Sequence, residues 1–374
     1  MTQGWSHKKL GEVCVLQRGF DLPKGDRKSG LVPLISSSGR SDYHDEAKVK
    51  GPGVVTGRSG SIGKVFFIEE DFWPLNTTLY VKEFYGNYPR FVAYLLNSFD
   101  LSRYTSGAGV PTLNRNHVHD ELVFVPESVE EQKRIVAILD QAFADIDQAR
   151  ATAEANLKNT RELFDSYLQQ VFNQRGEGWS QLTLGEIGRV SMCKRVLKAQ
   201  TSSSGDIPFF KIGTFGKEPD AFISRSMYED FKAKYSYPKL GDILLSASGT
   251  IGRRVIYDGK PAYFQDSNIV WIDNDERLVL NNYLYHFYGI CDWNPSKGAT
   301  ISRLYNDDLR RIKISFPAPN IQKQLVKNIS LLSEKIEIVQ ANYVKKLDSL
   351  DELKKSILQK AFTGELTKSK GIAA

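Results

Sequence analysis

The sequence contains the same unit twice, and this duplication constrains the fold more than any other feature. The matched blocks keep one order in both copies, and their separation grows from 174 residues to about 190 and then holds. Six ordered matches indicate a duplicated structural unit. The blocks are GWSHKKLGE and GWSQLTLGE, LVPLISSSG and DIPFFKIGT, TGRSGSIGKVFF and SASGTIGRRVIY, SGAGVPTLN and KGATISRLY, EQKRIVAIL and IQKQLVKNI, and LFDSYLQQVF and LKKSILQKAF.

The first part of each unit is predicted to be a mixed, mostly β domain. It has short apolar runs rich in β-branched and aromatic residues, separated by Gly, Pro, Ser and Asn. The runs GVVTG, KVFFIEE, TTLYVKEF, DILLSAS, RVIYDG and NIVWIDN read as strands. RFVAYLLNSF and NNYLYHFYGI read as short helices.

The second part of each unit is predicted to be a long helix. Pro126 and Pro317 precede the two segments, and no Pro or Gly occurs between Pro126 and Val171 or between Pro319 and Ala361. Apolar or small residues recur at alternating spacings of three and four, which is a heptad seam. The first seam is Ile135, Leu139, Ala142, Ile146, Ala149, Ala153, Leu157, Thr160, Leu163, Tyr167 and Val171. The second is Leu325, Ile329, Leu332, Ile336, Val339, Tyr343, Leu347, Leu350, Leu353, Ile357 and Ala361.

The two helices are expected to pair within the chain. Domain termini commonly lie close together, so the second helix would start where the first stops and the pair would run antiparallel. Alanines of the first helix (Ala142, Ala149, Ala153) would then nest against larger residues of the second, such as Leu332 and Val339. The expected fold class is α+β, with a pseudo-twofold internal repeat: two domains separated by an antiparallel two-helix coiled coil. Pairing with another chain is the alternative.

Charge and composition narrow the function classes. The net charge is +6, with 15 basic against 13 acidic residues in 1–126 and 19 against 15 in 179–317, so the excess belongs to the two mostly β parts. A basic excess suits domains that approach phosphate. Three scattered cysteines exclude a disulfide framework or zinc ribbon. No apolar run is long enough for a membrane span, and no signal peptide is evident, so a cytoplasmic location is expected.

The two glycine-rich stretches do not meet the requirements of a nucleotide-binding loop. In GRSGSIGKV the glycine spacing is one residue too long, and Val65 follows Lys64 where a magnesium-binding hydroxyl is needed. The run that follows reads as a strand, not a helix. Two interpretations remain: a tight turn that contacts DNA phosphates through its amides and through Arg58, Lys64, Arg253 and Arg254, or a hairpin turn without a ligand.

The sequence resembles the specificity subunits of type I restriction–modification enzymes. The resemblance rests on the paired unit starts, the glycine stretches, and the runs GAGVPTLNRNHVHDELVFVPESVEEQKRIVAIL and GATISRLYNDDLRRIKISFPAPNIQKQLV, and it covers nearly the whole chain. It implies two target recognition domains (1–126 and 176–317), two spacer helices (127–175 and 318–366) and a flexible C-terminal tail (367–374).

The resemblance also implies a function. Each recognition domain would read one half of a bipartite, asymmetric target in double-stranded DNA, and the helices would set the spacing. The subunit would not be an enzyme, and we find no methyltransferase or nuclease motif in it. It would direct two modification subunits, adenine-N6 methyltransferases, and the restriction (translocase-nuclease) subunits. S-adenosylmethionine, ATP and Mg²⁺ are expected only on those partners, so no cofactor or metal is expected here.

Basic side chains of the recognition domains are the candidate DNA contacts, since Arg commonly reads guanine and both Arg and Lys contact phosphate. Residues 36–50 and 225–239 have no strong counterpart in the other copy, and we expect recognition loops there; variable surface loops are the alternative. EEQKR and IQKQ near the helix starts are candidate partner contacts or simple solubilising residues. The DNA-binding candidates are Arg40, Arg58, Lys64, Arg103, Arg115, Lys194, Arg195, Lys211, Arg225, Arg253, Arg254 and Arg303.

Two competing functions remain at this point. A non-DNA-binding coiled-coil assembly scaffold explains the helices but not the basic residues of the glycine stretches. An enzyme with an unfamiliar active site requires a catalytic set that we do not find in the sequence.

Overall fold

The computed structural model describes residues 4–107, 111–293, 296–297 and 302–367. Contacts divide the chain into two units: unit 1 is Met1–Glu154 with Val344–Ala374, and unit 2 is Ala155–Tyr343. Each unit therefore contains a mostly β domain together with part of both long helices, α4 (Val129–Phe172) and α9 (Pro319–Phe362). None of the described helices is both long and apolar enough to cross a membrane.

In unit 1 a four-stranded antiparallel sheet of order β2-β8-β5-β6 forms the centre of the domain. A second sheet of order β4-β3-β7 adjoins it. The first strand of the domain, β1, pairs with its last strand, β11. The strands are β1 (Trp5–Lys9), β2 (Val15–Arg18), β3 (Val32–Ser36), β4 (Gly39–His44), β5 (Gly53–Gly57), β6 (Val65–Ile68), β7 (Trp73–Pro74), β8 (Thr78–Glu83), β9 (Thr105–Ser106), β10 (Thr112–Leu113) and β11 (Leu122–Pro126). The helices are α1 (Leu10–Val13), α2 (Pro89–Asn97) and α3 (Arg115–His119), with 3₁₀ turns η1 (Lys24–Asp26) and η2 (Leu101–Tyr104).

Unit 2 repeats this topology strand by strand. Its central sheet has the order β13-β19-β16-β17, its second sheet β15-β14-β18, and β12 pairs with β22. The strands are β12 (Trp179–Thr183), β13 (Gly188–Ser191), β14 (Ile207–Phe210), β15 (Phe222–Ile223), β16 (Ile243–Ser246), β17 (Arg254–Ile256), β18 (Tyr263–Phe264), β19 (Ile269–Asn274), β20 (Ser296–Lys297), β21 (Ser302–Arg303) and β22 (Lys313–Pro317). The helices are α5 (Leu184–Ile187), α6 (Arg225–Lys234), α7 (Asn281–Tyr288) and α8 (Asn306–Arg311), with 3₁₀ turn η3 (Lys198–Gln200).

The growing separation between the two copies has one main structural cause. Between β3 and β5, unit 1 has a single hairpin partner, β4, whereas the same interval of unit 2 also holds the helix α6. Ser224 caps this helix by accepting a hydrogen bond from the Met227 amide. α6 has no counterpart among the described residues of unit 1. The strands that follow α6 again match the strands of unit 1 in order.

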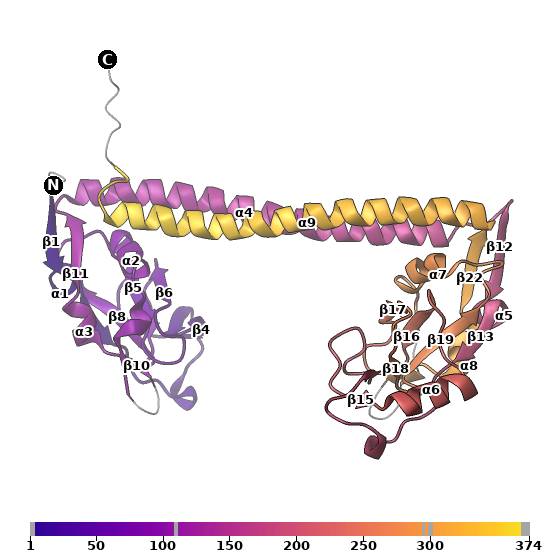
Figure 1. Ribbon diagram of the computed structural model, residues 1–374. Helices are drawn as coiled ribbons and strands as arrows, with labels where there is room; N and C mark the ends of the chain where they lie inside the picture. Colours follow the sequence, from indigo (N-terminus) through magenta and orange to yellow (C-terminus); the bar gives the residue numbers. More distant parts are fainter. Residues whose placement is uncertain (1–3, 108–110, 294–295, 298–301, 368–374) are drawn as a thin grey trace. The chain divides into compact units, whose positions relative to one another are not determined.

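Each domain packs against both long helices. In unit 1, α2 lies between the central sheet and the helices (Figure 1). Phe91 of α2 has its ring centroid 5.5 Å from that of Phe362 in α9, while Arg90 forms an ion pair of 2.9 Å with Asp140 in α4. In unit 2, Phe172 of α4 contacts Tyr283 of α7, with ring centroids 4.8 Å apart. The domain cores are thus continuous with the helix pair in each unit.

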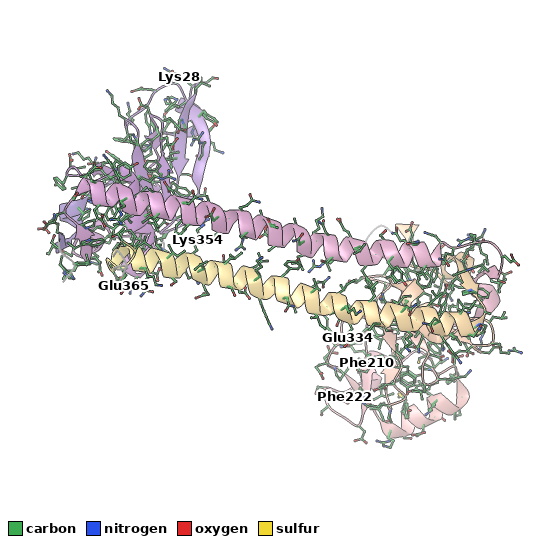
Figure 2. All side chains as sticks on the ribbon, turned by 90° about the horizontal axis from the view of Figure 1, so that it is seen from above. Lys28, Phe210, Phe222, Glu334, Lys354 and Glu365 are labelled. Carbon is green, nitrogen blue, oxygen red and sulfur yellow. The ribbon has the colours of Figure 1, made fainter. Side chains whose placement is uncertain are left out.

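The helices run antiparallel where they pair. In unit 1, Lys354 of α9 forms an ion pair with Asp147 of α4 at 2.9 Å, and Asp351 of α9 pairs with Arg150 of α4. The residue number rises along α4 while that of its partner in α9 falls, so the two helices run in opposite directions. Figure 2 shows Lys354 on the α9 ribbon beside α4. In unit 2, Leu168 and Val171 share a core with Ile329. The expected antiparallel pairing of the two segments within one chain is confirmed.

Two details of the predicted seam are wrong. Leu163 and Leu353 are 69% and 47% exposed, and the half-buried positions are Phe164 and Lys354 instead. A helix of 3.6 residues per turn drifts from a strict heptad, which moves the contact line by one residue. The alanine nesting is also wrong: the Asp147–Lys354 and Arg150–Asp351 pairs place Ala149 opposite the stretch of α9 around Asp351 to Lys354, far along the helix from Leu332 and Val339.

A buried glutamine joins the start of each long helix to its domain. Gln132 is 1% exposed; its Nε2 donates to Asn87 Oδ1 at 2.7 Å and to Pro126 O, and its Oε1 accepts from the Tyr88 amide at 2.8 Å. Gln322 repeats this by donating to the Leu278 and Pro317 carbonyls and accepting from the Leu280 amide. These glutamines of EEQKR and IQKQ are therefore internal clamps, neither partner contacts nor solubilising residues.

Candidate nucleic-acid interface

Both glycine stretches form the turns of β-hairpins. The first joins β5 to β6, and the second joins β16 to β17. Gly60 and Gly63 have φ of +80° and +79°, a backbone region that favours glycine, and Gly249 and Gly252 repeat it at +67° and +82°. The shared glycines are required by the turn itself, and the prediction that a strand follows each of them is confirmed.

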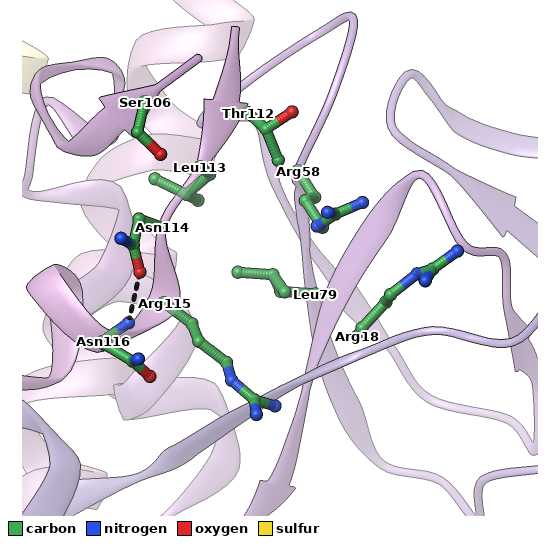
Figure 3. A pocket seen from close by; sticks show the side chains of 9 residues that line it. All are labelled: Arg18, Arg58, Leu79, Ser106, Thr112, Leu113, Asn114, Arg115 and Asn116. Atoms are coloured by element: carbon green, nitrogen blue, oxygen red, sulfur yellow. Dashed lines mark hydrogen bonds between the residues drawn. The ribbon is translucent and has the colours of Figure 1, made fainter.

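A pocket of about 340 Å³ lies beside the first of these turns and gathers three arginines (Figure 3). We call it the arginine pocket. Arg18 ends β2, Arg58 follows β5, and Arg115 begins α3. In Figure 3, Arg18 and Arg58 lie on one side of Leu79, and Asn114 and Asn116 lie on the other. The complete lining is Arg18, Arg58, Leu79, Ser106, Thr112, Leu113, Asn114, Arg115 and Asn116.

Backbone hydrogen bonds hold these segments together. The Leu113 amide donates to the Arg58 carbonyl at 2.8 Å, which fixes β10 against the hairpin turn. Asn114 caps α3 by accepting from the Asn116 amide at 3.1 Å, so the first residue of α3, Arg115, lies at the rim. The sequence separates Arg58 from Arg115 by 57 positions, and this backbone contact brings them to one pocket.

The three arginines differ in their internal partners. Arg18 lies 3.5 Å from Asp21, and Arg58 donates weakly to the Asn76 carbonyl at 3.5 Å. Within the described part of the chain, no carboxylate forms an ion pair with Arg58 or Arg115. Arg115 is exposed and Arg58 is half-buried, so both guanidinium groups keep donors available for an incoming ligand.

Unit 2 keeps the backbone of this site but not its arginines. The Leu304 amide donates to the Ala247 carbonyl at 2.8 Å, which matches the Leu113–Arg58 bond. Asn306 begins α8 where Arg115 begins α3, and Met192 and Cys193 follow β13 near the position of Arg18. Unit 2 instead has Arg303 in β21, whose guanidinium donates to the Ser267 carbonyl at 3.3 Å.

Several other predicted DNA contacts already interact with a neighbouring side chain of the same chain. Arg40 pairs with Glu70, Lys211 with Asp220 at 2.9 Å, and Arg195 with Asp266 at 3.6 Å. Arg225 lies 3.9 Å from Asp206, and Lys194 lies over the Tyr235 ring at 5.0 Å. These pairs are largely exposed and are weak in water, so they leave the role of the five cations in DNA binding as a prediction.

The candidates around the glycine turns separate by orientation. Lys64 is exposed at the end of the first turn. Arg253 donates to the Phe215 carbonyl at 2.9 Å, and the guanidinium of Arg254 lies 4.5 Å from the Tyr285 ring centroid. Arg103 is exposed near the Tyr104 ring. Lys64 and Arg103 are thus exposed, whereas Arg253 and Arg254 each have a contact within their own domain; a role in DNA binding stays a prediction for all four.

The two segments expected as recognition loops contain regular structure. Residues 36–50 include all of β4, which pairs with β3 through Val32 to Ser36. Residues 225–239 include the helix α6, which buries Tyr228. The segments are therefore not loops throughout, which corrects that part of the prediction, and their role in recognition stays a prediction. The sequence of these segments is mostly polar because Tyr43 and the basic residues face solvent. Only one side of each short element packs against its domain.

Two further pockets occupy equivalent places in the repeat, and we call them the helix-end pockets. One of about 490 Å³ in unit 2 is lined by Gln169, Phe172 and Asn173 of the α4 end, together with residues after α7. One of about 460 Å³ in unit 1 is lined by Gln359, Phe362 and Thr363 of the α9 end, together with residues after α2. The helix-end residues of the two pockets therefore correspond in the repeat, while the rest of each lining differs.

Burial shifts the pKa values of several titratable groups in the domains. Burial lowers the pKa of His119, whose Nε2 accepts a hydrogen bond from the Leu16 amide at 2.9 Å. Burial raises the pKa of the Cys14 and Cys193 thiols to about 12, which keeps them protonated. Among the described residues, no group of three or more His, Cys, Asp or Glu side chains is placed to hold a metal ion.

The fold defines a class of protein with two similar mixed domains and an antiparallel pair of long helices. The family model for the type I restriction modification DNA specificity domain matches this chain twice, over residues 2–157 and 176–355. The chain belongs to this family. It is 43% identical over 331 residues to a putative type I restriction enzyme specificity subunit of Haemophilus influenzae, covering 85% of each chain.

Solved structures share the fold. A chain described in connection with complex assembly and conformational transition of the type I R-M system matches with a TM-score of 0.79, at 18% identity, over 98% of this chain and 99% of that one. The HsdS subunit from Thermoanaerobacter tengcongensis matches with a TM-score of 0.64, at 18% identity, over 98% of each.

Proposed function

We propose that this protein is the specificity subunit of a type I restriction–modification complex, in which each domain reads one half of a bipartite, asymmetric DNA target. The proposal rests on one observation: the two domains share the same strand topology but differ in their surface side chains. Equal backbones suit two similar tasks on one duplex, and different side chains suit two different half-sites. The candidate contacts are the basic residues named above, with the arginine pocket the best formed group.

The chain supplies specificity, and its partners supply the chemistry. Its sequence holds no methyltransferase or nuclease motif, and the thiols of Cys14 and Cys193 are buried with raised pKa values. We assign adenine-N6 methylation with S-adenosylmethionine, and cleavage with ATP and Mg²⁺, to modification and restriction subunits in the cytoplasm. The two helix-end pockets support a complement of two identical modification subunits, one for each copy of the repeat.

The test is sequence-specific binding and methylation. Full-length chain, alone and co-expressed with a type I modification subunit, is assayed by gel shift on a random duplex pool, and the DNA of the co-expressing cells is sequenced for methyladenine. We expect enrichment of one bipartite sequence and methylation at it. Absence of any preferred sequence in both conditions would refute the proposal.

An assembly scaffold without DNA binding is the competing function. Charge reversal by Arg58→Glu and Lys64→Glu separates the two. These side chains are accessible, so a DNA-binding protein loses affinity and a scaffold is unchanged.

A further inference from the structure

The arginine pocket differs between the copies in a way that indicates what it binds. Phosphate contacts position a protein on DNA without reading sequence, so two domains on one duplex both need them. Side chains that read bases are expected to differ when the half-sites differ. At the site where unit 1 has Arg58 and Arg115, unit 2 has Ala247 and Asn306 on the same hydrogen-bonded backbone.

We propose that Arg58 and Arg115 read guanine in the half-site that unit 1 recognises. This inference rests on the proposed function and adds the base class and the residues that read it. Arginine forms bidentate hydrogen bonds to guanine O6 and N7, the commonest specific contact in the major groove. Unit 2, without these arginines, reads its half-site through other groups, and Arg303 is in place for that task.

The pocket has a fixed backbone on both sides and donors that can reach a base edge. The Leu113–Arg58 hydrogen bond and the capped start of α3 fix the backbone on both sides of the pocket. The Arg58 side chain is half-buried beside the Asn76 carbonyl, which limits its rotation. Asn114 and Asn116 add amide groups on the opposite side (Figure 3). An arginine fork can donate to the paired O6 and N7 acceptors of guanine as well as to a phosphate. The difference between the two copies therefore carries the choice of a base edge.

Arg18 has a supporting place in this site. It lines the same pocket, but its guanidinium lies 3.5 Å from Asp21, which also accepts from the Asn76 side chain. Asp21 and Asn76 thereby connect Arg18 to the carbonyl beside Arg58. We assign Arg18 a positioning role.

The test uses variants that the fold already tolerates in unit 2. Arg58→Ala and Arg115→Asn introduce the residues found at the equivalent positions there, so the unfolding midpoint should be unchanged. Each variant of the full chain is co-expressed with the methyltransferase subunits, and methylated sites are mapped by sequencing. Lys82→Ala, an exposed residue of β8 in the same sheet, is the matched control.

We expect each variant to relax one guanine position in one half-site and to leave the other half-site unchanged. Discrimination at that position should fall by roughly 5- to 150-fold, the range for one bidentate contact. A duplex with 7-deazaguanine there lacks the N7 acceptor, so it should weaken binding by the wild-type complex and not by the double variant.

Three results separate the possibilities. If the variants weaken binding to all duplexes equally and reduce its salt dependence, the pocket holds phosphate and the inference is overturned. If the variants keep the full target, or neither half-site contains guanine, it is also overturned. If the wild-type complex has no preferred sequence, the proposed function itself fails.

Discussion

Arg254 and His286 show how a residue's surroundings determine its role. The sequence places Arg254 next to a glycine turn, which favours a phosphate contact. In the structure its guanidinium stacks on Tyr285, and the Nε atom is buried. A Cβ on Gly289 would lie 2.6 Å from Arg254 Nη2, so the guanidinium lies directly against the backbone at the end of α7. Arg254 is therefore part of the packing around α7.

We predict an acid-sensitive contribution to stability from His286. Burial, assisted by the nearby positive charge of Arg254, lowers its pKa from 6.5 to about 4. The unfolded chain then binds the proton more readily, so this contribution is present above pH 6.5 and is lost as the pH falls toward 4. The shift corresponds to at most about 3 kcal/mol, or about 1–2 kcal/mol after solvent screening.

Urea unfolding at pH 7, 5 and 4 measures this contribution. His286→Asn should flatten the fall of the unfolding free energy between pH 6.5 and 4, whereas His117→Asn, an exposed imidazole of α3, should leave it as in the wild type. Equal pH slopes for wild type and His286→Asn would contradict the assignment.

At the scale of elements, the clamps at the helix starts are the least visible feature of the sequence. Gln132 and Gln322 occur in polar runs, where a glutamine is usually exposed. Each instead satisfies backbone groups at the end of one strand and at the start of one short helix. The long helix is thereby fixed to its domain at a defined point, and its direction relative to the domain core follows.

We predict that Gln322→Leu lowers the unfolding free energy by roughly 2–4 kcal/mol. The substitution leaves the buried Pro317 carbonyl and Leu280 amide without partners, and each such loss is costly. Thermal and urea unfolding measure the change. Lys323→Ala, on the exposed face of the same turn, should stay within about 0.5 kcal/mol. A Gln322→Leu protein as stable as the control would show that the clamp is dispensable.

At the scale of the whole molecule, duplication produces two similar helix-end pockets, the proposed partner surfaces, and two domains that differ at the arginine pocket, the proposed reading surface. The helix-end pockets carry Gln169, Phe172 and Asn173 in one unit and Gln359, Phe362 and Thr363 in the other. Unit 2 has Ala247 and Asn306 at the positions of Arg58 and Arg115 in the arginine pocket of unit 1. Parts that bind identical partners are expected to stay alike, and parts that read different half-sites are expected to diverge.

We predict that Gln169→Arg or Gln359→Arg removes one of two modification subunits from the complex. Both residues are exposed at a pocket rim, so a larger charged side chain blocks docking without disturbing the core. Native mass spectrometry of the co-expressed complex should give two partner copies for wild type, one for each single variant and none for the double variant. Lys217→Ala, exposed and outside both pockets, should retain two. Two copies bound by the double variant would place the docking site elsewhere.

The sequence by itself determined the repeat, the strand-rich domains and the two long helices, because hydrophobic spacing and turn residues act over short distances along the chain. The six strands and the two short helices that the sequence predicts are all present in the structure. Only the tertiary structure decided which charged groups are available and which are internal. Arg58 and Arg115 meet because a backbone hydrogen bond joins β10 to a distant hairpin turn, while Arg253, Arg254 and the clamp glutamines are occupied by neighbours that local spacing does not reveal.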